Sequence, residues 1–299
     1  MGPGLRRGDG LMSTQALFGQ LLIGLINGSF YALLSLGLAV IFGLLNIINF
    51  AHGAQYMLGA FAAYFLLNKA GLSYWWALVV APLVVGATGV AIERLMLQRL
   101  YKLDHLYGLL LTFGLALIFE GVFRNEFGSA GLPYSAPESL TGGLNLGFMF
   151  LPRYRAWVIG ASLVICLGTW FTIERTRLGA NLRAATENPT LVQAFGVNVP
   201  RMITLTYGAG VGLAALAGVF AAPIYQVSPQ MGSSLIIVVF AVVVIGGMGS
   251  IMGSIVTGFG LGLIEGLTKY FYPEASNTVI FVIMAIVLMV RPQGLFGQR

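Results

Sequence analysis

Long apolar runs, nearly free of charge, recur from one end of this chain to the other. Most approach the length of about 20 helical residues that crosses the roughly 30 Å apolar core of a bilayer. Only 9% of the 299 residues are charged, against about 25% in soluble domains. Lipid offers the backbone no hydrogen-bond partners, which favours helices. The runs fall near residues 17–45, 53–67, 77–97, 106–126, 157–173, 202–222, 234–250, 252–271 and 277–290.

The sequence therefore predicts an all-α, polytopic transmembrane helical bundle of about eight to nine membrane segments. Residues 1–299 are expected to form one transmembrane domain, with residues 1–14 as a flexible tail and 174–201 as a cytoplasmic loop. The net charge of +6 is spread over short loops and helix ends. The positive-inside rule explains that distribution better than nucleic-acid binding does.

Basic residues also predict the orientation. The loop 174–201 has the densest set, Arg175, Arg177, Arg183 and Arg201, so it is expected in the cytoplasm. Counting the segments places the C-terminus on the same side. The N-terminus is left open, because Arg6 and Arg7 favour the inside whereas nine crossings would place it outside.

Two short helices are expected within this loop. Leu178, Leu182 and Ala185 form one apolar stripe, and the stretch "ENPTLVQAFG" has the signals of a second helix over 187–197. Asn188 is a good N-cap, Pro189 suits the first turn, and Gly196 is a natural stop. Leu191, Val192 and Phe195 are expected on one face. That face is typical either of a helix at the membrane interface or of a docking helix for a soluble partner.

Two spans are interrupted. The stretch "GLLNIINFAHG" places Asn46, Asn49 and His52 between apolar runs, and "VIGGMGS" places Gly246, Gly247 and Gly249 inside another. Paired interruptions are typical of a transport pathway built from broken helices. The alternatives are close helix packing for the glycines, and hydrogen bonds that brace neighbouring helices for the polar set.

The sequence carries no signature of an enzyme. None of its three lysines is followed by Ser or Thr, so it has no phosphate-binding G-x-x-x-x-G-K-[ST] loop, and its two histidines form no H-E-x-x-H metal motif. Energy for transport must come either from a separate ATPase that docks at the loop 174–201 or from a gradient. Glu120 and Glu265 are the two carboxylates that lie deep enough in their spans to relay protons.

Five stretches carry a family resemblance. They are "NGSFYALLSLGLAVIFGLLNIINFAHGAQYMLGAF" (27–61), "RLGANLRAATENPTLVQAFGVN" (177–198), "GLAALAGVFAAPIYQVSPQMG" (212–232), "VIGGMGSIMGSIVTGFGLGLIEGL" (244–267) and "RPQGLFG" (291–297). In this order they resemble the permease subunits of branched-chain amino-acid ABC importers. The resemblance implies an inner-membrane subunit of a bacterium that passes leucine, isoleucine, valine or related small solutes into the cytoplasm.

The resemblance also implies partners and site residues. The partners are a second related permease, two ATPase subunits that bind ATP and Mg, and a periplasmic solute-binding protein. The chain itself is expected to need no cofactor or metal. The resemblance makes 187–197 the coupling helix, and we expect Arg183, Glu187, Leu191, Val192, Phe195 and Gly196 to form the coupling set. Pathway candidates are Asn46, Asn49, Phe50, His52, Gly246, Gly247 and Gly249. The alternatives are a urea- or amide-type permease of the same family and a stand-alone proton-coupled carrier.

Overall fold

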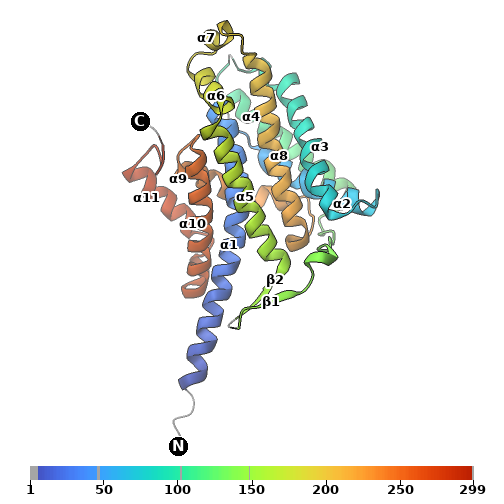
Figure 1. Ribbon diagram of the computed structural model, residues 1–299, viewed down its shortest axis with the longest axis vertical. Helices are drawn as coiled ribbons and strands as arrows, with labels where there is room; N and C mark the ends of the chain where they lie inside the picture. Colours follow the sequence, from blue (N-terminus) through green and yellow to red (C-terminus); the bar gives the residue numbers. More distant parts are fainter. Residues whose placement is uncertain (1–5, 46–47, 102, 148, 298–299) are drawn as a thin grey trace, which may run out of the picture.

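The computed structural model describes residues 6–45, 48–101, 103–147 and 149–297. Within these residues, nine of the helices run through or along the bundle (Figure 1). They are α1 (Arg6–Leu45), α2 (Ala51–Asn68), α3 (Tyr74–Leu95), α4 (His105–Phe127), α5 (Arg153–Arg175), α8 (Val199–Tyr225), α9 (Met231–Gly246), α10 (Ile251–Phe271) and α11 (Val279–Val290). Asn46 lies outside the described residues.

Six of the described helices are long and apolar enough to cross a membrane. They are α1, α3, α4, α5, α8 and α10. Helices α9 and α11 are apolar but shorter, and the 18-residue α2 contains His52, Gln55 and Asn68. Each of the nine expected segments is thus a helix, and six of them have the properties of a span. The chain is a multi-pass membrane protein.

The two ends of the bundle differ. Two short helices, α6 (Arg177–Glu187) and α7 (Pro189–Ala194), lie at one end, together with the segment that follows α11. At the other end is an antiparallel hairpin of β1 (Gly143–Asn145) and β2 (Phe150–Pro152) (Figure 1). The segment that leads from α4 to this hairpin is attached to the residues just after α8, because Leu132 and Val227 exchange backbone hydrogen bonds of 2.8 and 2.9 Å. Helix α1 begins at Arg6, inside the 1–14 segment.

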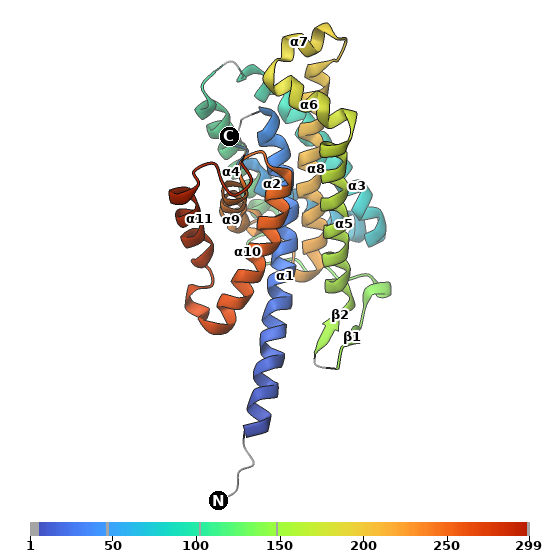
Figure 2. The same cartoon turned by 60° about the vertical axis from the view of Figure 1, so that its left-hand side comes forward.

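Helix α1 is the central element, and its closest neighbour is α10 (Figure 2). Glycines on both helices allow this approach. An added Cβ at Gly262 would lie 2.4 Å from the Gly24 carbonyl oxygen and 2.4 Å from the Gly28 Cα. Because lipid is as apolar as the side chains, helix association in a bilayer depends on such close packing rather than on the hydrophobic effect.

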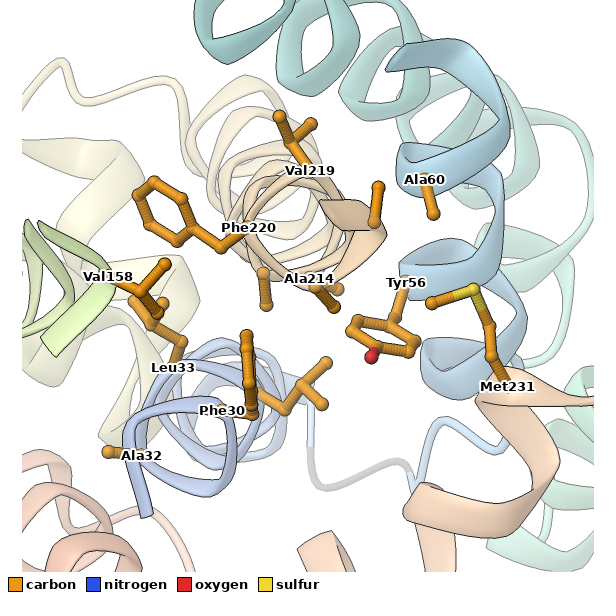
Figure 3. Close-up of a cluster of buried hydrophobic side chains, with 14 of the residues drawn as sticks. Phe30, Ala32, Leu33, Tyr56, Ala60, Val158, Ala214, Val219, Phe220 and Met231 are labelled. Carbon is orange, nitrogen blue, oxygen red and sulfur yellow. The ribbon is translucent and has the colours of Figure 1, made fainter. Parts of the chain in front are cut away.

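The main core lies between α1, α2, α5, α8 and the start of α9. Phe30 and Leu33 of α1 meet Phe220 of α8 and Val158 of α5, and Tyr56 of α2 lies between Phe30 and Met231 (Figure 3). In contrast, few residues of α4 and α5 are fully buried, and each helix exposes a row of apolar side chains, among them Leu110 and Leu117 of α4 and Val164 and Phe171 of α5. We infer that those faces contact lipid.

Candidate functional site

The break between α1 and α2 is a buried polar cluster. Asn49, His52 and Gln55 are completely buried. His52 Nε2 lies 3.0 Å from the Leu34 carbonyl oxygen of α1, and the Asn49 side-chain amide donates to Gln55 Oε1 over 3.2 Å. His52 also packs against Gly37, where a Cβ would lie 3.1 Å from the ring. These contacts tie the start of α2 to the middle of α1.

Helices α4 and α9 hold the same break from outside. The backbone N–H of Phe50 donates to Thr112 Oγ1 over 3.2 Å, and the same hydroxyl lies 3.2 Å from the Ile48 carbonyl oxygen. The Phe50 ring packs between Phe113 of α4 and Phe240 of α9, with centroid distances of 6.0 and 4.7 Å. Two backbone groups at the break, the Phe50 N–H and the Ile48 carbonyl, therefore have a partner on a neighbouring helix, as apolar surroundings demand. This geometry favours the bracing interpretation for Asn49, Phe50 and His52.

The glycine-rich break follows α9, which ends at Gly246. Gly247 and Gly249 have φ angles of +102° and +84°, a backbone region that glycine enters without strain. The C-terminal segment 291–297 covers this helix end. Leu295 N–H donates to the Ile245 carbonyl over 2.8 Å, and Phe296 N–H donates to the Gly246 carbonyl over 3.1 Å.

Sequence reasoning missed this capping role of "RPQGLFG". The two segments fit together because both are glycine-rich: a Cβ at Gly247 would lie 2.5 Å from the Gly297 nitrogen. On the other side of the break, Ser250 caps α10 by accepting from Gly253 N–H over 3.1 Å. The last carbonyls of one helix and the first N–H groups of the next thus find partners.

Helices α6 and α7 form largely as expected. The Asn188 side chain accepts from Leu191 N–H over 3.0 Å, Pro189 begins α7, and Gly196 follows it with φ +84°. Helix α7 ends at Ala194, earlier than the predicted bound at 197. Asn188 alone separates α6, which ends at Glu187, from α7, because Asn188 leaves helical geometry to act as the cap.

The predicted face of α7 is wrong for one residue. Leu191 and Phe195 are 54% and 79% exposed, but Val192 is only 8% exposed and packs with Ala185 of α6 and Val199 of α8. Neighbouring positions on a helix point about 100° apart, and the inward-facing residue is taken up by the contact with α8. The exposed apolar face of α7 and its C-cap therefore consists of Leu191 and Phe195.

A cavity of about 330 Å³ separates α6 from the glycine-rich break. Its lining includes Gly249, Arg183, Glu174 and Phe296. Arg183 donates to the Ile173 carbonyl over 2.8 Å and lies 3.5 Å from the Glu174 carboxylate. Arg183 is thus engaged with the end of α5, whereas Glu187 is exposed to solvent.

The two carboxylates considered for proton relay have different surroundings. Glu120 pairs with Arg124 one turn later on the exposed helix α4. Glu265 of α10 instead accepts hydrogen bonds from two residues of α1, the Asn27 amide over 3.1 Å and the Tyr31 hydroxyl over 2.7 Å. Tyr225 at the end of α8 joins this network by donating to Asn27 Oδ1 over 2.6 Å.

Among the described residues, no three His, Cys, Asp or Glu side chains lie close enough to hold an ion.

Comparison with known proteins gives a consistent set of relatives. The family model described as "Branched-chain amino acid transport system / permease component" matches residues 20–288. The high-affinity branched-chain amino acid transport system permease protein LivH of Escherichia coli (strain K12) is 30% identical, over 96% of this chain and 98% of that protein. The corresponding BraD of Pseudomonas aeruginosa is 29% identical over 93% and 95%. LivM of Escherichia coli is 28% identical over 89% and 67%. No solved structure matches.

Proposed function

The chain belongs to the family of permease components of branched-chain amino acid transport systems, and on that premise we propose that it is the membrane subunit of an ABC importer for leucine, isoleucine, valine or closely related small solutes. The observation that carries the proposal is similarity along nearly the whole chain to LivH and BraD, whose names state this transport. The six apolar helices fit that role. We place the protein in the inner membrane of a bacterium, with eight or nine membrane segments and the C-terminus in the cytoplasm.

The partners follow from the same premise. Because the chain is similar to both LivH and LivM of one organism, we propose that it pairs with a second, related permease. Two ATPase subunits would bind ATP and Mg, and a periplasmic protein would deliver the solute. Transport would proceed by alternating access, in which closure of the ATPase subunits rocks the helices.

The α6–α7 segment suits the contact with an ATPase. Phe195 and Leu191 present exposed apolar surface at α7, and Leu178 of α6 is also 50% exposed. An apolar helix face entering a groove is a common docking mode. Val192 would transmit the movement, since it packs against Val199 at the start of α8. Arg183, bonded to the end of α5, would connect the segment to a second spanning helix, with Glu187 at the polar rim.

Uptake of labelled leucine by vesicles that hold this chain and its partners tests the proposal. The expected result is uptake that requires internal ATP and resists a proton uncoupler. Uptake that needs no ATPase and collapses with the uncoupler would support the proton-coupled carrier instead. Uptake of labelled urea or acetamide without leucine would indicate the amide-type permease.

The docking surface is tested separately by Phe195→Asp in the assembled transporter. We expect a charge at this position to weaken ATPase binding at least about tenfold, because it must be desolvated in an apolar groove, and to reduce uptake with it. Phe271→Asp is the matched control, since Phe271 is 73% exposed at the end of α10, away from α7 (Figure 1). Intact ATPase binding and uptake in Phe195→Asp would place the docking surface elsewhere.

A further inference from the structure

A second cavity lies among α1, α2, α8 and the start of α9, toward the end of the bundle opposite α7. Its volume is about 420 Å³, within the range of roughly 300–1,000 Å³ found for ligand sites. Four aromatic rings line it: Phe30 and Tyr31 of α1, Tyr56 of α2 and Tyr225 of α8. The wall is completed by Asn27, Ser228, Gln230, Met231, Ser234 and Leu235.

One side of this cavity is built to accept hydrogen bonds from a cation. The Tyr31 hydroxyl gives its proton to Glu265, and the Tyr225 hydroxyl gives its proton to Asn27 Oδ1. Each hydroxyl therefore has only acceptor capacity left. Glu265, held by Asn27 and Tyr31, supplies negative charge directly behind them. Aromatic rings add attraction for an ammonium group.

Another side favours an anion. Helix α9 begins at Met231, and its N-cap residue Gln230 makes no side-chain capping bond. The Met231 N–H donates to the Ser228 carbonyl over 3.3 Å, and the other first-turn N–H groups together with the helix dipole make such an end favourable for a carboxylate. Ser234, in the first turn of the same helix, lines the cavity.

Tyr56 supplies a further polar group. Its side chain is only 1% exposed, and among the described residues its hydroxyl has no hydrogen-bond partner. The hydroxyl oxygen is not enclosed by protein atoms, so it is available to pair with a polar group inside the cavity. In Figure 3 the Tyr56 ring lies between Phe30 and Met231, so the hydroxyl sits at an otherwise apolar wall.

We propose that this cavity binds an apolar α-amino acid in its zwitterionic form as it passes through the protein. The ammonium group lies at the Tyr31 and Tyr225 hydroxyls, backed by Glu265. The carboxylate lies at the start of α9, and the aliphatic side chain packs against Phe30, Met231 and Leu235. The proposal rests on the proposed function and adds the place in this chain where the solute binds.

Thiol labelling tests the site. Cys166 is the chain's single cysteine and is completely buried, so an introduced cysteine is the reactive thiol of this chain. In the assembled transporter, with cysteine-free partners, Ser234→Cys reports on the cavity, and Ser129→Cys, in the exposed loop after α4, is the control. A charged, membrane-impermeant thiol reagent is added during turnover with leucine. We expect leucine to slow labelling at position 234 at least fivefold and to leave the labelling rate at position 129 unchanged. Valine should give the same protection as leucine, and aspartate should give none.

A second variant identifies the charged group. Glu265→Gln in the Ser234→Cys background keeps the size of the side chain and removes its charge. We expect labelling without leucine to continue at its former rate, which shows a folded cavity, and the protection by leucine to disappear. Glu120→Gln is the control, because it removes the charge that pairs with Arg124 on α4. This variant is expected to keep the protection by leucine.

The outcomes separate the two proposals. If the Ser234→Cys transporter takes up leucine with ATP but leucine does not change its labelling, the cavity is not the binding site and the proposed function stands. Protection at positions 129 and 234 alike, or protection that survives Glu265→Gln, also overturns the assignment. If the unmodified transporter takes up no leucine at all, the proposed function itself fails.

Discussion

At the scale of the residue, two glycines of α10 differ only in what surrounds them. A Cβ at Gly262 would lie 2.4 Å from the Gly24 carbonyl oxygen of α1, whereas a Cβ at Gly260 would meet no atom within 4 Å. We expect Gly262→Ala to push α1 and α10 apart and to destabilise the protein by about 1–3 kcal/mol, the usual cost of overpacking. Gly260→Ala should be neutral or slightly stabilising because alanine favours helix. Thermal unfolding in detergent measures both; equal midpoints would contradict the close α1–α10 contact.

A second residue-scale prediction concerns His52. His52→Ala removes the contact with the Leu34 carbonyl and leaves a void at the α1–α2 break. We expect a loss of about 2 kcal/mol or more of stability, with the KM for leucine of the remaining folded transporter unchanged. The chain's other histidine, His105, is exposed at the start of α4, and His105→Ala is the control. Normal stability combined with lost uptake in His52→Ala would show that His52 lines the pathway.

Single residues also mark how far the sequence could predict this site. Capping at Asn188, the start at Pro189 and the turn at Gly196 follow from local chemistry, and all three are confirmed. The inward direction of Val192 could not be predicted, because it depends on packing against Val199 of another helix. Glu265 could be singled out as a carboxylate in an apolar span, but its contacts come from Asn27 and Tyr31, more than 230 positions away.

At the scale of the element, the C-terminal segment acts as the cap of α9. Gly247 has φ +102° and no room for a Cβ beside Gly297, while Gly71 has φ +64° and open space. Gly247→Ala should therefore lose more stability than Gly71→Ala by about 1–3 kcal/mol, because both strain the backbone but only one displaces the cap. Chemical denaturation of the two variants gives the difference. Equal losses would mean that the segment 291–297 does not restrain the end of α9.

The same element explains a limit of sequence reasoning. The stretch "VIGGMGS" is visible as a glycine-rich interruption and "RPQGLFG" as part of the family resemblance, yet nothing in either pattern pairs them. Their contact is made by backbone groups, Leu295 N–H with Ile245 and Phe296 N–H with Gly246. Backbone hydrogen bonds leave no trace in the side-chain pattern, and so they are invisible to the apolar-length rule that located the helices.

At the scale of the whole molecule, the helices were predictable because lipid leaves the backbone few alternatives. Apolar length located the nine helices, but it did not show which of them surround α1. That arrangement depends on small residues such as Gly24 and Gly28, which allow α10 to approach. It brings the cavity near Glu265 to one end of the bundle, whereas α6 and α7 lie at the other (Figure 1). A solute would have to pass between these ends, past the core in Figure 3.

This separation of the ends makes a prediction about orientation. Thr190, in α7, and Ser129, in the loop after α4, are both exposed, and they lie at opposite ends of the bundle. Because the basic loop 174–201 is expected in the cytoplasm, Thr190→Cys should react with an impermeant thiol reagent only after the membrane is opened. Ser129→Cys should react in intact cells, as should Glu274→Cys in the exposed turn after α10. Buried Cys166 keeps the background low. If Thr190→Cys reacts in intact cells, the protein has the opposite orientation in the membrane. An ATPase in the cytoplasm could then not dock on α7.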